Sequence, residues 1–325
     1  MLPACSRLAC PSKRRSCLSA DAVVFDHVSY RYGAVQAVAD LSLSIRSGEM
    51  FGIIGPDGAG KTTTIRMLCG LLRSHTGSIR VLGLDPVAQH RAVTSSVGYL
   101  SQRFSLYSDL SINENIAFFA EIHAVRDYAA RRTRLLELTQ LTPFGDRLAG
   151  QLSGGMKQKL ALACTLIHEP RVIVLDEPTT GVDPVSRREF WKLLSEFLSQ
   201  RITIVMSTPY LDEAERCARV ALLHNGRLLA LDTPDALRRA LPGSLFEVMT
   251  SDHRRAVAVL KSLPGVADVQ TFGERAHVRV LDAPTDAAAQ LTRHLTDAGV
   301  DVTLVRQVSA SLEDVFVSRL GETPS

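Results

Sequence analysis

The chain has 325 residues and a formal net charge of +3, with 46% apolar and 22% charged residues. This length and composition predict a globular protein with one large and one small domain or two medium-sized ones, and the low charge argues against a nucleic-acid partner. No stretch approaches the ~18 consecutive apolar residues of a membrane helix, so a role at a membrane would require a separate partner.

The first 20 residues contain three of the six cysteines, Cys5, Cys10 and Cys17, beside a short basic run. They lack the apolar core of a signal peptide. Their spacing also lacks the CxxC pairs of a typical zinc site, although zinc remains the alternative. We therefore expect residues 1–20 to be a disordered tail or an over-long start, and the chain as a whole is typical of a reduced, cytosolic protein.

Strand and helix patterns alternate after this tail. Apolar alternation predicts strands near residues 23–30 and 39–45, and a buried strand at 50–54 precedes a glycine loop and a helix. The pattern is almost wholly helical from about 111 to 164. Further strands and helices are predicted at 172–175, 186–199, 202–206 and 212–217, with a hairpin around Asn225-Gly226. These elements predict an α/β layered domain over residues 21–240 with a helical insertion at about 103–165.

Leu241-Pro-Gly243 marks a second boundary. Residues 243–325 then follow the order strand, helix, strand, strand, helix, strand, with a last helix at 311–320. The βαββαβ order predicts a small α+β domain of ferredoxin-like type. It carries no evident catalytic constellation.

A phosphate-loop pattern, GxxxxGK[ST], follows the strand at 50–54. Its glycines let successive backbone N–H groups surround phosphate oxygens, and the following helix offers its positive N-terminus. We expect Lys61 to reach the β- and γ-phosphates of ATP and the Thr62 hydroxyl to bind Mg²⁺. A plain glycine turn is the alternative, but the flanking strand and helix favour a nucleotide site. The candidate residues are Gly55, Pro56, Asp57, Gly58, Ala59, Gly60, Lys61, Thr62 and Thr63.

Two carboxylates end the buried strand at 172–175. Asp176 is expected beside the magnesium ion, where it holds a coordinating water. Glu177 is expected to face the γ-phosphate as general base for the attacking water. Many buried strands end in an acidic residue, so this motif is informative chiefly in combination with the phosphate loop.

A second glycine-containing helix start reads Leu152-Ser-Gly-Gly-Met-Lys-Gln158. It resembles the signature motif of ABC transporter ATPases, and the resemblance extends over about residues 23–240 with the motifs in the right order. In that family the signature caps the γ-phosphate of ATP bound to the opposite subunit. The resemblance therefore implies an ATPase dimer in which Ser153, Gly154 and Gly155 contact the partner's nucleotide.

The resemblance implies roles for three more residues. Tyr32 resembles the aromatic residue that stacks on adenine, although a tyrosine on a strand surface is the alternative. Gln102 resembles the glutamine that senses magnesium and the attacking water, and a plain loop residue is its alternative. Asp183 resembles the loop aspartate that links the two sites across the dimer.

One position departs from the family. Its members usually carry a histidine two residues after the serine that ends the last core strand, and here Pro209 occupies that place. Proline offers no donor to the γ-phosphate. We expect slower hydrolysis or a substitute group, for which adjacent Tyr210 is the nearest candidate.

The segments 177–190 and 312–316, the latter reading LEDVF, resemble the exporter branch with separate permeases, in particular drug-efflux ATPases. This resemblance implies a cytoplasmic subunit, peripheral on the cytoplasmic face of the cell membrane, that contacts the membrane only through integral permease subunits. Helices near residues 102–121 would dock on the permease. Apolar residues there are expected to divide between core and an exposed groove: Phe104, Leu106, Tyr107, Ile112, Ile116, Phe118 and Phe119.

Three alternatives remain open. A soluble ABC ATPase acting on ribosomes or DNA is disfavoured by the single ATPase half and the absence of a heptad run. Pro209 motivates a nucleotide-dependent regulator with weak hydrolysis, against which the intact Glu177 speaks. An import ATPase is the third. The residues decide neither the transported substrate nor whether the dimer is a homodimer or a heterodimer.

Overall fold

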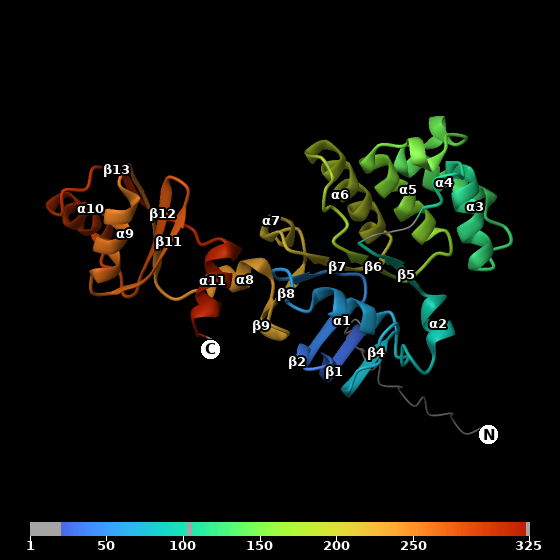
Figure 1. Ribbon diagram of the computed structural model, residues 1–325, viewed down its shortest axis with the longest axis horizontal. Coiled ribbons are helices and arrows are strands. Elements are labelled where there is room, and N and C mark those ends of the chain that lie inside the picture. Colours follow the sequence, from blue (N-terminus) through green and yellow to red (C-terminus); the bar gives the residue numbers. More distant parts are fainter. Residues whose placement is uncertain (1–20, 103–105, 323–325) are drawn as a thin grey trace, which may run out of the picture.

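The structure is a computed structural model and describes residues 21–102 and 106–322. In this part of the chain the strands form three sheets. Two of them lie in a larger body, and the third forms a smaller lobe beside it (Figure 1). None of the helices in these ranges combines the length and apolar character needed to cross a membrane. The tail expected at residues 1–20 and Phe104 lie outside the described residues.

An antiparallel sheet forms one layer of the larger body, in the order β2-β1-β4. It consists of β1 (Asp21–Tyr32), β2 (Val35–Arg46) and β4 (Thr76–Val81). The predicted alternation is visible as burial of every second residue over much of β2, since one face of the sheet packs on the core while the other faces solvent.

A second sheet forms the centre of this body, in the order β5-β6-β7-β3-β8-β9. All neighbours are parallel except the β8–β9 hairpin. Strands β3, β6 and β7 are buried along their whole length, because helices or the first sheet cover both faces. The strands are β3 (Met50–Ile54), β5 (Val97–Leu100), β6 (Val172–Asp176), β7 (Thr203–Thr208), β8 (Arg219–His224) and β9 (Arg227–Asp232).

Helix α1 (Lys61–Leu68) lies between the two sheets, and its buried residues share one core with both (Figure 1). Helices α5 (Gly154–Leu166) and α6 (Pro184–Ser199) contribute to a second core that includes residues of β6 and β7. The predicted helical insertion contains α5 together with α3 (Ile112–Ile122) and α4 (Ala129–Thr139).

The smaller lobe confirms the ferredoxin-like prediction. Its sheet has the order β11-β12-β10-β13 with every pair antiparallel. Two helices cover one face of this sheet with their apolar sides. The elements are β10 (Ser244–Thr250), α9 (His253–Ser262), β11 (Val266–Phe272), β12 (Arg275–Val280), α10 (Ala287–Asp297) and β13 (Val302–Val308).

The last helix, α11 (Leu312–Glu322), packs against the larger body and not against α9 and α10 (Figure 1). It contacts α7 (Leu211–Ala214), α8 (Pro234–Arg239) and β9. Leu312 and Val315 are buried there in the core that contains α6. The domain division at residue 243 stays a prediction, since α11 connects the two parts.

Several short elements lack a periodic signal in the sequence. They are β4, β5, α2 (His90–Thr94) and α8, each of six residues or fewer. Windows this short contain too few apolar positions to distinguish a period of 2 from one of 3.6.

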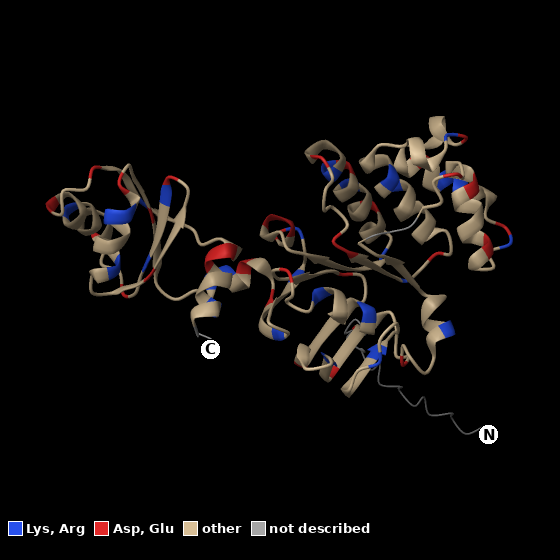
Figure 2. Cartoon of the chain, in the orientation of Figure 1, with Lys and Arg blue, Asp and Glu red and all other residues tan. Residues whose placement is uncertain are grey.

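Figure 2 shows basic and acidic positions interspersed over both parts of the chain.

Candidate nucleotide-binding site

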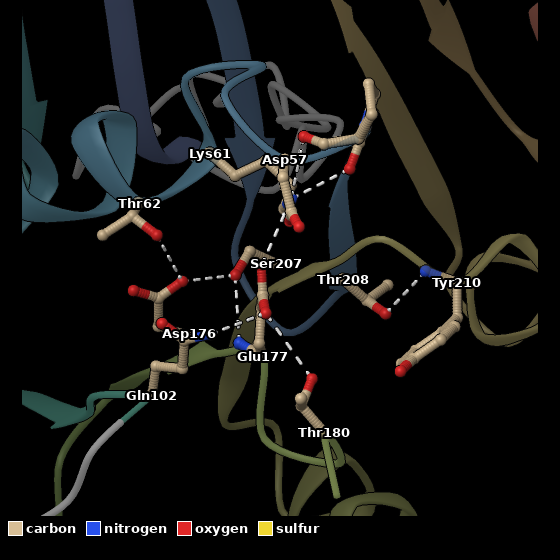
Figure 3. Close-up of polar contacts among 12 residues, drawn as sticks. Asp57, Lys61, Thr62, Gln102, Asp176, Glu177, Thr180, Ser207, Thr208 and Tyr210 are labelled. Carbon is tan, nitrogen blue, oxygen red and sulfur yellow. Dashed lines mark hydrogen bonds and ion pairs between the residues drawn. The ribbon is translucent and has the colours of Figure 1, made fainter.

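Three neighbouring parallel strands end at the same edge of the central sheet. β3 leads into the glycine loop at residues 55–60, β6 ends at Asp176, and β7 ends at Thr208. Ligands of open α/β sheets bind outside such carboxyl ends. Figure 3 shows how the polar side chains of this edge converge.

Backbone geometry explains two of the loop glycines. A Cβ atom on Gly55 would lie 2.3 Å from the carbonyl oxygen of Leu223. Gly60 has φ +99°, and a Cβ there would lie 2.4 Å from the carbonyl oxygen of Ala37. Gly60 caps α1 without a side-chain hydrogen bond. Because α1 begins directly after Gly60, the backbone N–H groups of its first turn adjoin the loop. This arrangement is typical of helix N-termini that bind anions.

Lys61 is the buried cation of the site, with 4% of its side chain exposed. Its ammonium group donates to the carbonyl oxygens of Gly55 at 2.9 Å and Pro56 at 3.1 Å. It also forms an ion pair with Glu177, with 3.2 Å between Nζ and Oε1. The exposed Asp57 carboxylate lies farther off, at 3.9 Å. The ammonium group thus lies between the loop and the end of β6 (Figure 3).

Asp176 is almost completely buried and joins the loop to β7. Its Oδ1 atom accepts hydrogen bonds from the Thr62 hydroxyl at 3.1 Å and from the Ser207 hydroxyl at 2.6 Å. Hydroxyl and carboxylate oxygens are the ligands that Mg²⁺ prefers. The residues present therefore fit a magnesium ion.

Glu177 adopts a left-handed backbone conformation, with φ 49°. Its N–H donates to the carbonyl and the hydroxyl oxygen of Ser207, each at 3.1 Å. Its Oε2 atom accepts from Gln102 Nε2 at 2.9 Å and lies 3.5 Å from the Thr180 hydroxyl. Non-glycine residues in this conformation cost free energy and cluster at functional sites. The structure thus brings together Lys61, Thr62, Gln102, Asp176 and Glu177, five of the candidate residues of the sequence analysis.

Two further residues of this edge were not among the sequence predictions. Ser207 links Asp176 to Glu177, and the only sequence signal is its place at the end of a buried strand. Glu213 is buried and accepts hydrogen bonds from Thr179 and Thr208. It ties the segment after Glu177 to the end of β7, and no local pattern announces this role.

Four predicted residues, in β1 and at the start of α5, are not among those labelled in Figure 3. Tyr32, 45% exposed at the end of β1, packs edge to face on Tyr30 with ring centroids 4.9 Å apart. Ser153 caps α5 by accepting from the N–H of Met156 at 3.3 Å. Gly154 and Gly155 follow it in the first turn of α5.

Asp183 and the signature segment adjoin one another. A Cβ on Gly155 would lie 2.2 Å from the Ser186 hydroxyl and 3.8 Å from a carboxylate oxygen of Asp183. Asp183 caps α6 by accepting from the N–H groups of Val185 and Ser186, each at 3.0 Å. The Ser186 side chain and these N–H groups lower the pKa of the Asp183 carboxyl below its ordinary value.

Pro209 follows the end of β7, and Tyr210 lies beyond it. The Tyr210 N–H donates to the Thr208 hydroxyl at 3.0 Å. Its ring, 37% exposed, lies under the Arg187 guanidinium, 5.2 Å from the ring centroid. Thr208 separates Tyr210 from Glu177 in the close-up (Figure 3).

Comparison with known proteins agrees with this geometry. Residues 38–180 match the family described as ABC transporter, and residues 233–319 match the ATP-binding protein DrrA1-3-like C-terminal domain. The chain is 36% identical over 306 residues to the daunorubicin resistance ATP-binding protein DrrA2 of Streptomyces coeruleorubidus, covering 92% of this chain and 95% of that protein.

Two further similarities involve a longer relative and a solved structure. The chain is 44% identical over 290 residues to the probable multidrug ABC transporter ATP-binding protein YbhF of Escherichia coli (strain K12). That match covers 88% of this chain but 49% of YbhF, so the chain spans about half the length of this relative. A solved ATP-binding subunit of an ABC transporter superposes with a TM-score of 0.62 at 30% identity, covering 67% of this chain and 92% of that one. The chain belongs to the family of ABC transporter ATP-binding proteins.

Proposed function

We propose that this chain binds ATP with Mg²⁺, hydrolyses it, and thereby powers a membrane permease that exports drugs or other hydrophobic compounds. The observation that carries the proposal is the convergence of Lys61, Thr62, Gln102, Asp176 and Glu177 at the end of three parallel strands. The buried ammonium, the oxygen ligands and the adjacent carboxylate are the groups that phosphoryl transfer requires.

Each residue then has a specific task. The N–H groups of the loop and Lys61 hold the β- and γ-phosphates, and the Lys61 charge stabilises the leaving phosphate. Thr62, Gln102 and Asp176 would hold the magnesium ion, which neutralises phosphate charge when bound. Glu177 accepts a proton from the attacking water, and the Gln102 amide orients that carboxylate through its hydrogen bond.

A second ATPase subunit completes the site in this proposal. Ser153, Gly154 and Gly155 lie at the start of α5, outside the cluster around Lys61. A helix start with free N–H groups suits a phosphate, so these residues would cap the nucleotide of the partner subunit. Asp183 adjoins this segment and would link the two sites. Both a homodimer and a heterodimer satisfy these contacts.

The permease would dock on the segment after Gln102. Ile112 and Ile116 are fully buried and belong to the core. Tyr107 is 44% exposed and packs edge to face on the half-buried Phe118. This partly exposed aromatic pair supports a docking groove for a permease helix, with the chain peripheral on the cytoplasmic face of the membrane.

The relatives support the class of substrate. DrrA2 is named for daunorubicin resistance and YbhF for multidrug transport, and the C-terminal match covers the ferredoxin-like lobe. Because the chain spans about half of YbhF, we infer its own substrate only at the level of hydrophobic compounds.

A regulator with weak hydrolysis is the second candidate, and Pro209 is the observation that favours it. This position offers no hydrogen-bond donor toward Glu177, because proline lacks a backbone N–H and its ring is apolar. Tyr210, held against Arg187, adjoins Pro209 in the chain and is the substitute that we propose on that ground.

Steady-state ATP hydrolysis with Mg²⁺ tests both candidates. We expect measurable turnover by the unaltered chain, near-complete loss in Glu177→Gln with ATP binding retained, and faster turnover in Pro209→His. Tyr210→Phe should slow turnover if its hydroxyl substitutes for the missing donor. ATP binding and dimerisation without turnover would favour the regulator, and failure to bind ATP would refute both candidates.

A further inference from the structure

A cavity of about 330 Å³ lies at the edge of the central sheet opposite the candidate nucleotide site. Its lining includes Ser47, Arg171 and Thr203, which precede or begin β3, β6 and β7. The candidate nucleotide-binding site lies at the carboxyl ends of these same strands. The cavity is therefore a separate feature, and its volume is at the lower end of the range for small-molecule sites.

The interior of this cavity is apolar. Leu135 of α4, Leu166 of α5 and Phe197 of α6 line it, and all three are buried. Pro170 and Ile202 extend the same wall. The helical insertion and the central sheet both contribute, so an occupant would contact both. An apolar body of small size fits such a wall, because it removes further apolar surface from water.

The rim is strongly cationic. Four arginines and one glutamate line the cavity: Arg131, Arg134, Arg171, Arg201 and Glu169. Arg131 pairs with Glu169, with 2.8 Å between Nε and Oε1, and also donates to the carbonyl of Ile167 at the end of α5. Within residues 21–102 and 106–322, no ion pair joins Arg134, Arg171 or Arg201 to a carboxylate. The rim therefore carries an excess of positive charge directly above an apolar wall.

The backbone at the rim adds an independent observation. Arg201 has φ 62° and follows the end of α6, where the N–H of Ile202 donates back to the carbonyl of Phe197 at 3.3 Å. Helices favour glycine at this left-handed position, because a Cβ atom is unfavourable there. Glu169, three residues after the end of α5, also has a left-handed backbone, with φ 54°. The chain thus places charged side chains at two positions where glycine fits better, a pattern found at functional sites.

We propose that this cavity binds a small organic anion with an apolar body, such as a medium-chain carboxylate or alkyl phosphate. The anionic head lies at the rim near Arg171 and Arg201, because guanidinium groups recognise carboxylate and phosphate oxygens. The apolar body lies against Leu135 and Phe197. Free carboxylic acids and phosphate-bearing lipid fragments share this chemistry.

Fluorescence titration of the full chain with 8-anilinonaphthalene-1-sulfonate tests the proposal, in the presence of Mg·ATP so that the nucleotide site is occupied. N-phenyl-1-naphthylamine has the same rings without the sulfonate and serves as the neutral probe. We expect saturable binding of the sulfonate with higher affinity than the neutral probe, and a decrease in that affinity at higher salt.

Arg201→Gly is the decisive variant, since glycine suits φ 62° and the thermal midpoint should not fall. We expect its affinity for the sulfonate to fall about three- to tenfold, with the neutral probe unaffected. Arg293→Ala, an exposed arginine of α10 outside the cavity, is the matched control and should bind as the unaltered chain does. Leu138→Trp retains every arginine and narrows the cavity, so both probes should bind more weakly.

Competition by decanoate and by decyl phosphate identifies the head group. Displacement by decanoate at lower concentration assigns a carboxylate ligand, and the reverse order assigns a phosphate. Equal sulfonate affinity in Arg201→Gly and the unaltered chain would show that the arginine only terminates α6, and displacement by neither competitor would also overturn the proposal.

Discussion

Replacing Ser207 by alanine probes the connection between the strands that carry the candidate catalytic groups. The Ser207 side chain is fully buried at the end of β7. Its hydroxyl donates to Asp176 Oδ1 at 2.6 Å and accepts from the N–H of Glu177 at 3.1 Å. Alanine removes both contacts while preserving the strand.

The expected loss of stability follows from these contacts. A buried hydrogen bond to a charged group contributes roughly 1.5–3 kcal/mol. The N–H of Glu177 retains the Ser207 carbonyl as an acceptor, so the second contact is only partly lost. We expect the free energy of unfolding to fall by about 2 kcal/mol, which moves the urea midpoint by about 1 M. If Asp176 then shifts during turnover, kcat should fall at least about tenfold.

The single tryptophan gives a direct assay. Trp191 is buried in α6, so its fluorescence reports unfolding of the larger body. Ser195→Ala is the matched control, because the Ser195 hydroxyl donates to the carbonyl of Trp191 within the same helix and contacts no candidate site residue among those the structure describes. A Ser207→Ala protein with the stability and turnover of this control would refute the reasoning that the hydroxyl holds Asp176 in place.

Three further predictions concern other parts of the chain. Gly60→Ala should weaken ATP binding at least tenfold in a fluorescent-nucleotide titration, because φ +99° and the Ala37 carbonyl at 2.4 Å exclude a methyl group. Burial, and secondarily the adjacent His123, lowers the pKa of His168 to about 4 from 6.5. Between pH 6.5 and pH 4 the unfolded state therefore binds more protons than the folded state, and the free energy of unfolding falls as the pH falls. We expect His168 to lower that free energy by about 2 kcal/mol over this range, a figure that allows for its partial exposure. Asp314→Asn should weaken the attachment of α11 to the rest of the chain, because this buried carboxylate accepts from His277 Nδ1 and from the Ser311 N–H, each at 2.8 Å. Faster amide hydrogen exchange in α11 would show this weakening.

Each of these predictions has a contradicting outcome. ATP affinity in Gly60→Ala equal to that of the unaltered chain would show that the loop adapts to a methyl group. His168→Gln keeps a donor for the Val97 carbonyl, and the same acid loss of stability in this variant would assign the effect to other groups. Unchanged exchange in α11 of Asp314→Asn would show that Leu312 and Val315 alone hold the helix.

The candidate site was predictable where chemistry follows local order along the chain. The candidate phosphate loop at 55–63 was recognisable because three closely spaced glycines, at 55, 58 and 60, lead directly into a helix start. Asp176 and Glu177 were recognisable since they end a buried strand. Ser207 and Glu213 were not, because their partners lie 31 and 34 residues away in the chain, in Asp176 and Thr179.

The sequence alone determined the layered α/β body, the βαββαβ lobe and the order of the phosphate-binding motifs, since each rests on the periodicity or composition of a continuous segment. Tertiary structure decided where the apolar faces of those segments pack. The helix at 312–322 has one apolar side, and only the fold shows that this side covers α8 and β9. The tertiary structure likewise decided that the arginines of α4 and of two separate loops surround one cavity. An apolar face specifies that it must be covered, but the surface that covers it depends on the packing of the whole chain.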